Sequence, residues 1–185
     1  MVWRSLGKVM LYIYVCNAVS LGCISSSEYQ RQNQELLKFL HEMGGSFPVS
    51  CRGELIPSVR KVQNHLKKLQ NHLQKVKVED AVSVTLAMFQ EVQKLFTRNF
   101  SAAKWNKIKA DNFLELLYQQ SNVLHHCLVE KKMQSKNNKA VKVTNKYFKK
   151  LLKILKQKGY DRCSWEFVRD QVRTILQYSE PITVQ

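Results

Sequence analysis

Glycine and proline are absent from residues 58–158, and this absence bears directly on the fold class. Strands joined by tight turns need these residues at their corners, so the sequence argues against a β-rich chain. Apolar residues in the same stretch recur at intervals of three and four, as they do on one face of a helix. The sequence therefore predicts an all-α fold, a bundle of five long helices.

The expected helices cover about 29–43, 79–96, 105–127, 140–156 and 163–176. Gly44–Gly45 ends the first helix, and Asp161 can cap the last after a break at Gly159. The long first connection carries an extra amphipathic helix, with a heptad seam at Val59, Val62, Leu66, Leu69, Leu73 and Val76. This seam is short for a stable coiled coil. It either packs along the bundle or forms a partner or self-association surface.

Long apolar runs are missing after residue 22, so no membrane span is expected. Residues 1–22 have the layout of a secretory signal peptide, with Arg4 and Lys8 before an apolar run at 9–19 and small residues before the cut. A buried N-terminal helix is the alternative. The expected mature domain, residues 23–185, is secreted and soluble, and it keeps +14 of the formal charge of +16.

Cysteine is scarce, and after the leader the remaining residues are Cys23, Cys51, Cys127 and Cys163. None has the Cys-x-x-Cys spacing of a zinc or redox site. An even number in a secreted chain predicts two disulfides, with three possible pairings.

Catalytic motifs are missing as well. The sequence contains no Gly-rich phosphate loop, no His-Glu-x-x-His and no Gly-x-Ser-x-Gly. His65 and His72 can share a helix face, but two imidazoles without a third ligand make a poor metal site. We therefore expect neither an enzyme nor a cofactor or metal site.

Acidic residues are absent from two basic stretches. Residues 131–158 contain eleven lysines and residues 60–77 contain six basic residues, with no carboxylate in either. Clustered lysine attracts polyanions with little geometric selectivity, and for a secreted protein these are sulfated glycosaminoglycans or anionic membranes. No base-reading surface is evident, so nucleic acid is not an expected partner. A solvated helix face is the alternative to glycan binding, for which the candidates are Lys131, Lys132, Lys136, Lys139 and Lys142.

One Asn-x-Ser sequon occurs, at Asn99–Ser101. It falls between the second and third expected helices, where a glycan would not disturb packing. Asn99 is therefore a predicted glycosylation site.

Three stretches carry a more specific signal. Residues 147–169, YFKKLLKILKQKGYDRCSWEFVR, are similar to the closing segment of type I interferons, and residues 101–127, SAAKWNKIKADNFLELLYQQSNVLHHC, to the third helix of that family. Residues 46–51, SFPVSC, resemble the kappa-like branch. The resemblance implies an up-up-down-down cytokine bundle and a secreted antiviral cytokine that bridges two receptor chains to trigger JAK–STAT signalling.

The resemblance also implies a disulfide pairing. In that family the first cysteine pairs with the third and the second with the fourth, which here gives Cys23 with Cys127 and Cys51 with Cys163. The second bond would hold the first connection against the last helix as one rigid surface.

In type I interferons this surface binds the high-affinity receptor chain. Arg169 matches the family's helix arginine and is expected to face outward, with a structural salt bridge to Glu166 as the alternative. Val172 and Arg173 follow on or near that side, and Leu37 matches a contact position on the first helix. The second receptor chain would dock on the opposite side, formed by the second, third and fourth helices.

The sequence departs from the family at several of these positions. Arg52 and Leu55 stand where the family has leucine and arginine, and Asp170 and Arg173 replace small and apolar residues. Arg52 is still a receptor-contact candidate, but these charges put the identity of the partner in question. A related helical cytokine with another receptor pair is one alternative. A cationic host-defence protein that acts on membranes is another, although two long-loop disulfides and five core stripes indicate a rigid globule.

Overall fold

The computed structural model describes residues 26–53, 56–76, 78–130, 132 and 139–179. These ranges contain six α-helices and no strand, which confirms the all-α fold class. The helices are α2 (Ser26–Gly44), α3 (Ile56–Leu73), α4 (Val78–Phe96), α5 (Lys107–Glu130), α6 (Lys139–Gln157) and α7 (Arg162–Ser179). Two short 3-10 turns, η1 (Val49–Cys51) and η2 (Ser101–Ala103), precede α3 and α5.

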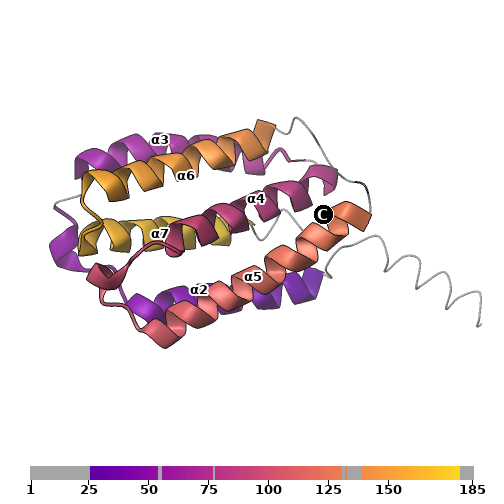
Figure 1. Cartoon of the computed structure of the whole chain (residues 1–185). Helices are drawn as coiled ribbons and strands as arrows, with labels where there is room; N and C mark the ends of the chain where they lie inside the picture. The colour runs from indigo at the N-terminus through magenta and orange to yellow at the C-terminus, as the bar shows by residue number, and fades with distance from the viewer. Residues whose placement is uncertain (1–25, 54–55, 77, 131, 133–138, 180–185) are drawn as a thin grey trace, which may run out of the picture.

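The six helices stack in three layers of two (Figure 1). Helices α3 and α6 lie side by side at one edge, α2 and α5 at the opposite edge, and α4 and α7 between them. Helix α4 contacts α5 and α6, whereas α7 contacts α2, α3 and α6. The bundle therefore has one broad face made by α4, α5 and α6 and another made by α2, α7 and α3.

The ends of α2, α4 and α6 meet the starts of α3, α5 and α7 at one end of the bundle, which we call the tied end (residues 43–51, 96–106 and 159–165). Here the backbone N–H of Asn106 donates to the carbonyl of Met43 at 2.8 Å, and a disulfide joins Cys51 to Cys163. Consequently α2 and α4 run in one direction and α5 and α7 in the other, which is the predicted up-up-down-down order (Figure 1). Helix α6 runs antiparallel to α3.

Aromatic rings fill the tied end. The Trp105 ring stacks 5.5 Å from Phe96 and lies 5.4 Å from Phe100. The Trp165 ring of α7 meets Trp105 edge-on at 5.7 Å, and the Tyr160 ring lies 6.3 Å from the Trp165 ring. Each such pair adds about 0.5–1.5 kcal/mol to the burial of its rings. The cluster therefore fixes the start of α7 against the turn between α4 and α5.

The heptad seam of α3 packs on the bundle. Val62, Leu69 and Leu73 are buried, and Leu66 and Val76 pack partly buried against the core. The side chain of Val59 lies outside the described residues. Of the two interpretations of this segment, the simpler one, an extra helix packed along the bundle, is confirmed, and α3 takes its place beside α6 and α7.

Two helix starts can be compared with the sequence expectations. The backbone N–H of Ser164 donates to the Asp161 carboxylate at 2.7 Å, so Asp161 caps α7 as predicted. Helix α5 begins at Lys107, two residues later than expected. Trp105 belongs to the aromatic cluster instead, and the Asn106 side chain accepts the backbone N–H of Lys109 at 3.2 Å.

Candidate functional site

The first connection is attached covalently to the last helix. Cys51, at the end of η1, is bonded to Cys163 in the first turn of α7, with the two Cα atoms 5.2 Å apart. This is the pairing that the resemblance implies. Cys127 is also disulfide-bonded, but Cys23 lies outside the described residues, so the bond between Cys23 and Cys127 stays a prediction.

Arg169 reaches from α7 to the end of α2. Its guanidinium donates through Nη1 to the carbonyl of Leu40 at 2.6 Å and through Nη2 to the carbonyl of Gly45 at 2.8 Å. It also binds the Glu166 carboxylate through Nε at 3.0 Å and Nη2 at 2.6 Å. A cation at a helix C-terminus is favourable because the last carbonyls carry partial negative charge. Arg169 thus holds α2 and the first connection against α7.

Glu166 extends the same network to the start of α5. Its second carboxylate oxygen accepts the indole N–H of Trp105 at 2.7 Å. The side chains of Arg169 and Glu166 are only 6% and 2% exposed. Both charged groups are paired by the hydrogen bonds described above, inside the protein. A buried ion pair is tolerated only with such additional hydrogen bonds.

The expectation that Arg169 faces outward is therefore wrong. The alternative, a structural salt bridge with Glu166, describes its environment. Val172 is also unsuited to direct contact, because it is completely buried in the core. Arg169 follows Trp165 by four positions and precedes Val172 by three, so both Arg169 and Val172 lie on the inner stripe of α7. They support the surface residues without being exposed themselves.

The close approach of Arg169 leaves no room for a side chain at Gly44. A Cβ there would lie 2.8 Å from Nε of Arg169 and 3.0 Å from Cδ1 of Trp105. We expect Gly44→Ala to lower the free energy of unfolding by about 1–3 kcal/mol, although alanine is the better helix former. Urea denaturation measures the change. Gly53→Ala is the control, because a Cβ at Gly53 meets nothing within 4 Å. An equal effect of both substitutions would contradict the packing argument.

The remaining predicted contact residues differ in exposure. Arg52 is exposed beside the disulfide, and Leu37 is half-buried against the core. The Arg173 side chain is 45% exposed and pairs with Asp170 at 2.7 Å. Val49 of η1, which sequence reasoning missed, is 74% exposed. In a connection without periodicity, no pattern tells which side chain faces solvent.

Three of the five glycan-binding candidates are among the described residues. Lys132, just after α5, is exposed, as are Lys139 and Lys142 in the first turn of α6. Lys131 and Lys136 lie outside the described residues.

The sequon asparagine lines an open hollow of about 510 Å³ at the tied end. Arg98, Ser101, Gly159 and Tyr160 are among the other residues around it. Asn99 is exposed, and its side-chain oxygen accepts the backbone N–H of Ser101 at 2.9 Å. The geometry gives a glycan access to Asn99, whose glycosylation stays a prediction.

The described residues offer neither a metal site nor a membrane span. No group of three or more His, Cys, Asp or Glu side chains there is arranged to hold a metal ion. The Nδ1 atom of His72 lies 2.8 Å from the carbonyl oxygen of Lys68, one turn earlier on α3. In the same part of the chain, no helix has the length and apolar character needed to cross a bilayer.

The interferon alpha/beta domain model matches residues 26–185 of this sequence. The chain belongs to the interferon alpha/beta family. Human interferon alpha-17 is 28% identical over 175 residues, which cover 92% of this chain and 88% of the human protein. Bovine interferon beta-2 is 35% identical over 99 residues, which cover 51% and 52% of the two chains. Zebrafish interferon 1 has a similar fold, with a TM-score of 0.69 at 23% identity over 85% of this chain and 96% of the zebrafish chain.

Family membership makes this chain a type I interferon-like cytokine. Interferons are cytokines and not enzymes, which agrees with the lack of a catalytic motif in the sequence. The branch of the family, kappa-like or other, stays a prediction.

Proposed function

We propose that this interferon is a secreted antiviral cytokine that binds two receptor chains at once and triggers JAK–STAT signalling. The observation that carries the proposal is the tied end, where the Cys51–Cys163 bond and the Arg169 network join the first connection, α2 and α7. A preorganised surface loses little conformational entropy on binding. The interferon would supply binding energy alone, and receptor-associated kinases would carry out the chemistry.

The high-affinity receptor chain would bind the face of α2, α7 and η1. Arg52 and Arg173 are exposed there as charged anchors, Leu37 is half-buried, and Val49 offers an apolar side chain beside the disulfide. Arginines and well-packed apolar anchors carry much of the binding energy at protein interfaces. Arg169 and Val172 would act as positioning residues beneath this surface.

The second receptor chain would dock on the opposite face, made by α4, α5 and α6. Tyr118 and Val129 of α5 are 57% and 53% exposed. They are three helical turns apart and therefore on the same side of the helix. Exposed tyrosine is typical of interface anchors, so we place contacts for the second chain at these two residues.

Direct action on membranes is the less favoured alternative. A membrane-active helix inserts its apolar side into the bilayer. The apolar side of the lysine-rich helix α6 packs into the core of the bundle, where Tyr147, Phe148 and Leu151 are almost completely buried. Insertion would require unfolding of the bundle.

STAT phosphorylation in cells of the source organism tests the proposal. The oxidised chain without residues 1–22 should give a response that is lost when the receptor chains are deleted. A response that persists without them, or vesicle leakage that is screened by salt, would support the membrane alternative. A well-folded sample that causes no STAT phosphorylation would contradict the receptor proposal.

A single substitution tests the first receptor surface. We expect Arg173→Ala to raise the concentration needed for half-maximal STAT phosphorylation by about 5- to 30-fold, since truncation of an interface arginine typically costs about 1–2 kcal/mol. Lys94→Ala is the control, because Lys94 is also an exposed helix cation with an acidic partner three residues earlier, Glu91, but it lies on α4, outside the first receptor surface. Equal responses of the two variants would place the contact elsewhere.

A further inference from the structure

All seven lysines of α6 lie on one side of the helix. They are Lys139, Lys142, Lys146, Lys149, Lys150, Lys153 and Lys156. At 3.6 residues per turn these positions fall within an arc of about 120°, opposite the buried side of the helix. The stripe is about 25 Å long at 1.5 Å per residue. Helix α6 thus presents a straight row of positive charge along one edge of the bundle.

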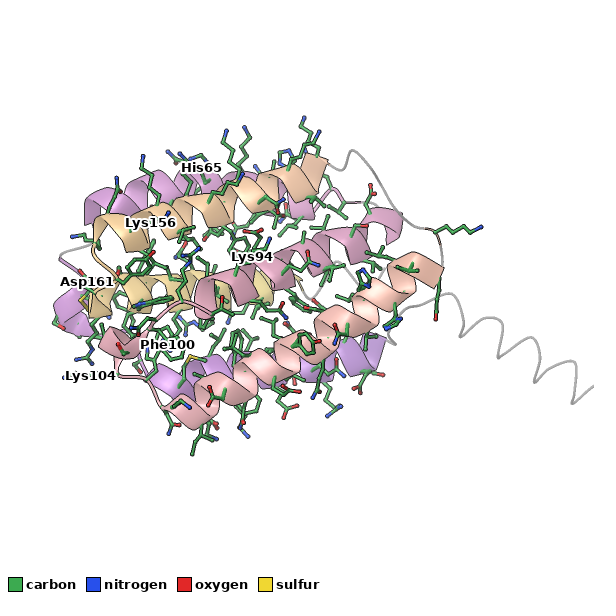
Figure 2. The ribbon with its side chains drawn as sticks, in the orientation of Figure 1. His65, Lys94, Phe100, Lys104, Lys156 and Asp161 are labelled. Atoms are coloured by element: carbon green, nitrogen blue, oxygen red, sulfur yellow. A yellow bond between two sulfur atoms is a disulfide. The ribbon has the colours of Figure 1, made fainter. Side chains whose placement is uncertain are left out.

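Helix α3 adds positive charge beside this row. His65 of α3 is close to Lys150 and Lys146 of α6 and to Lys68 of its own helix: its burial first, and then these three charges, hold the pKa of the imidazole below its usual value. In Figure 2 the nitrogen-tipped side chains project from the edge formed by α3 and α6, with His65 among them. We define the basic edge as His65, Lys67, Lys68, Lys146, Lys149, Lys150 and Lys153.

Within the described residues, no carboxylate forms an ion pair with a lysine of the basic edge. Neither α3 nor α6 contains an aspartate or glutamate. The ion pairs found in the described ranges belong to α2, α4, α5 and α7, and none involves a lysine of the basic edge. Like charges held this close repel one another. An anion placed over the edge would therefore relieve repulsion as well as gain attraction.

The shape and composition of the edge select the class of anion. Lysines are compact point charges without the bidentate geometry of arginine, and a straight row of them matches a chain with repeating negative charges. The exposed large apolar residues of the described part of the chain lie on η1, α5 and α7, so the edge has none to insert into a membrane or stack on a nucleobase. We propose that the basic edge binds a linear sulfated glycosaminoglycan.

This site differs from the one expected from the sequence. Lys139 and Lys142 begin the α6 row, which continues along the helix to Lys156. The layer of α3 and α6 is on the far side of the bundle from α2 and α5 (Figure 1). A glycan bound there leaves Arg52 and Val49 of the first receptor surface uncovered. The interferon would thus be retained at sulfated surfaces while it remains able to engage that receptor chain.

Surface plasmon resonance on immobilised heparin tests the site. The variant Lys146→Gln/Lys149→Gln/Lys153→Gln removes three charges whose side chains are exposed on α6. Counterion release makes log K fall with log salt, by about one slope unit for each charge contact. We expect the variant to lose about 2–3 units of slope and its affinity at physiological salt to fall about tenfold or more.

The control is Lys38→Gln/Lys104→Gln/Lys107→Gln, which removes the same charge from exposed lysines outside the basic edge. It should keep the slope and, within about twofold, the affinity. Equal losses in the two variants would mean a net-charge effect and overturn the proposal. Stronger binding to phosphatidylserine vesicles than to heparin of equal charge would also overturn it, in favour of a membrane surface.

The glycan site and the receptor function can fail separately. STAT phosphorylation by the unsubstituted interferon is measured on cells that lack sulfated glycans, whereas the heparin assay contains no receptor. A signal on those cells together with an unaltered heparin slope in the basic-edge variant would reject the glycan site and leave the receptor proposal standing.

Discussion

Replacing Arg169 with alanine is expected to lower the free energy of unfolding by about 3–5 kcal/mol. The substitution leaves the Glu166 carboxylate buried without its cation and removes the donors to Leu40 and Gly45. An uncompensated buried charge costs far more than the pair contributes when intact. Urea denaturation followed by far-UV circular dichroism measures the loss. STAT phosphorylation should fall with it, because the first connection is no longer held against α7.

Two further variants separate the possible causes. Arg173→Ala removes a pair of identical spacing on the same helix, but an exposed one, and should cost less than about 0.5 kcal/mol. Glu166→Gln/Arg169→Met should recover more than half of the loss, since no buried charge remains and the amide oxygen can still accept the Trp105 N–H. An effect of Arg169→Ala as small as that of Arg173→Ala would show that the network does not hold α2 to α7.

Removal of the Cys51–Cys163 bond is the second change with a large expected effect. The two cysteines are 112 residues apart in sequence, so the bond closes most of the domain into one loop. The Cys51→Ser/Cys163→Ser variant should lose about 2–5 kcal/mol of stability. Thermal unfolding measures this loss. Signalling should also weaken under conditions where the variant is still folded, because η1 loses its attachment to α7.

The effect of the bond on signalling can be separated from its effect on stability. The Lys107→Gln variant leaves the first connection unperturbed and sets the baseline for signalling. A folded double-serine variant that signals as well as this baseline would mean that the bond contributes stability alone. The first receptor surface would then depend on the Arg169 network rather than on the disulfide.

The helical periodicity of α7 was a better guide than residue type. Arg169 lies four residues after Trp165 and three before Val172, and both of those neighbours are completely buried. The same spacing places Arg169 on the inner stripe, whereas its charge alone favours the surface unless a partner such as Glu166 is available. Its partners, the carbonyls of Leu40 and Gly45, are more than a hundred residues away in sequence. No local pattern encodes such a contact.

The fold was predictable because its signals are local. The missing glycines and prolines and the spacing of apolar residues gave the helices, and the seam of α3 marked the extra one. The packing of α3 against α6 was not predictable, since an amphipathic stripe shows that a helix face is buried but not which element packs against it. For that reason the lysine-rich segments were recognisable in the sequence, but the proximity of His65 to Lys146 and Lys150 was not.

The aromatic cluster of the tied end has a spectroscopic consequence. The sequence contains three tryptophans, and Trp3 belongs to the predicted leader. The other two, Trp105 and Trp165, meet at 5.7 Å in the cluster. Tryptophan fluorescence of the chain without its leader therefore reports the tied end alone, whereas far-UV circular dichroism reports every helix. Coincident transitions would indicate one cooperative unit. An earlier fluorescence change would mean that an interferon can lose its receptor surface while its helicity still looks intact.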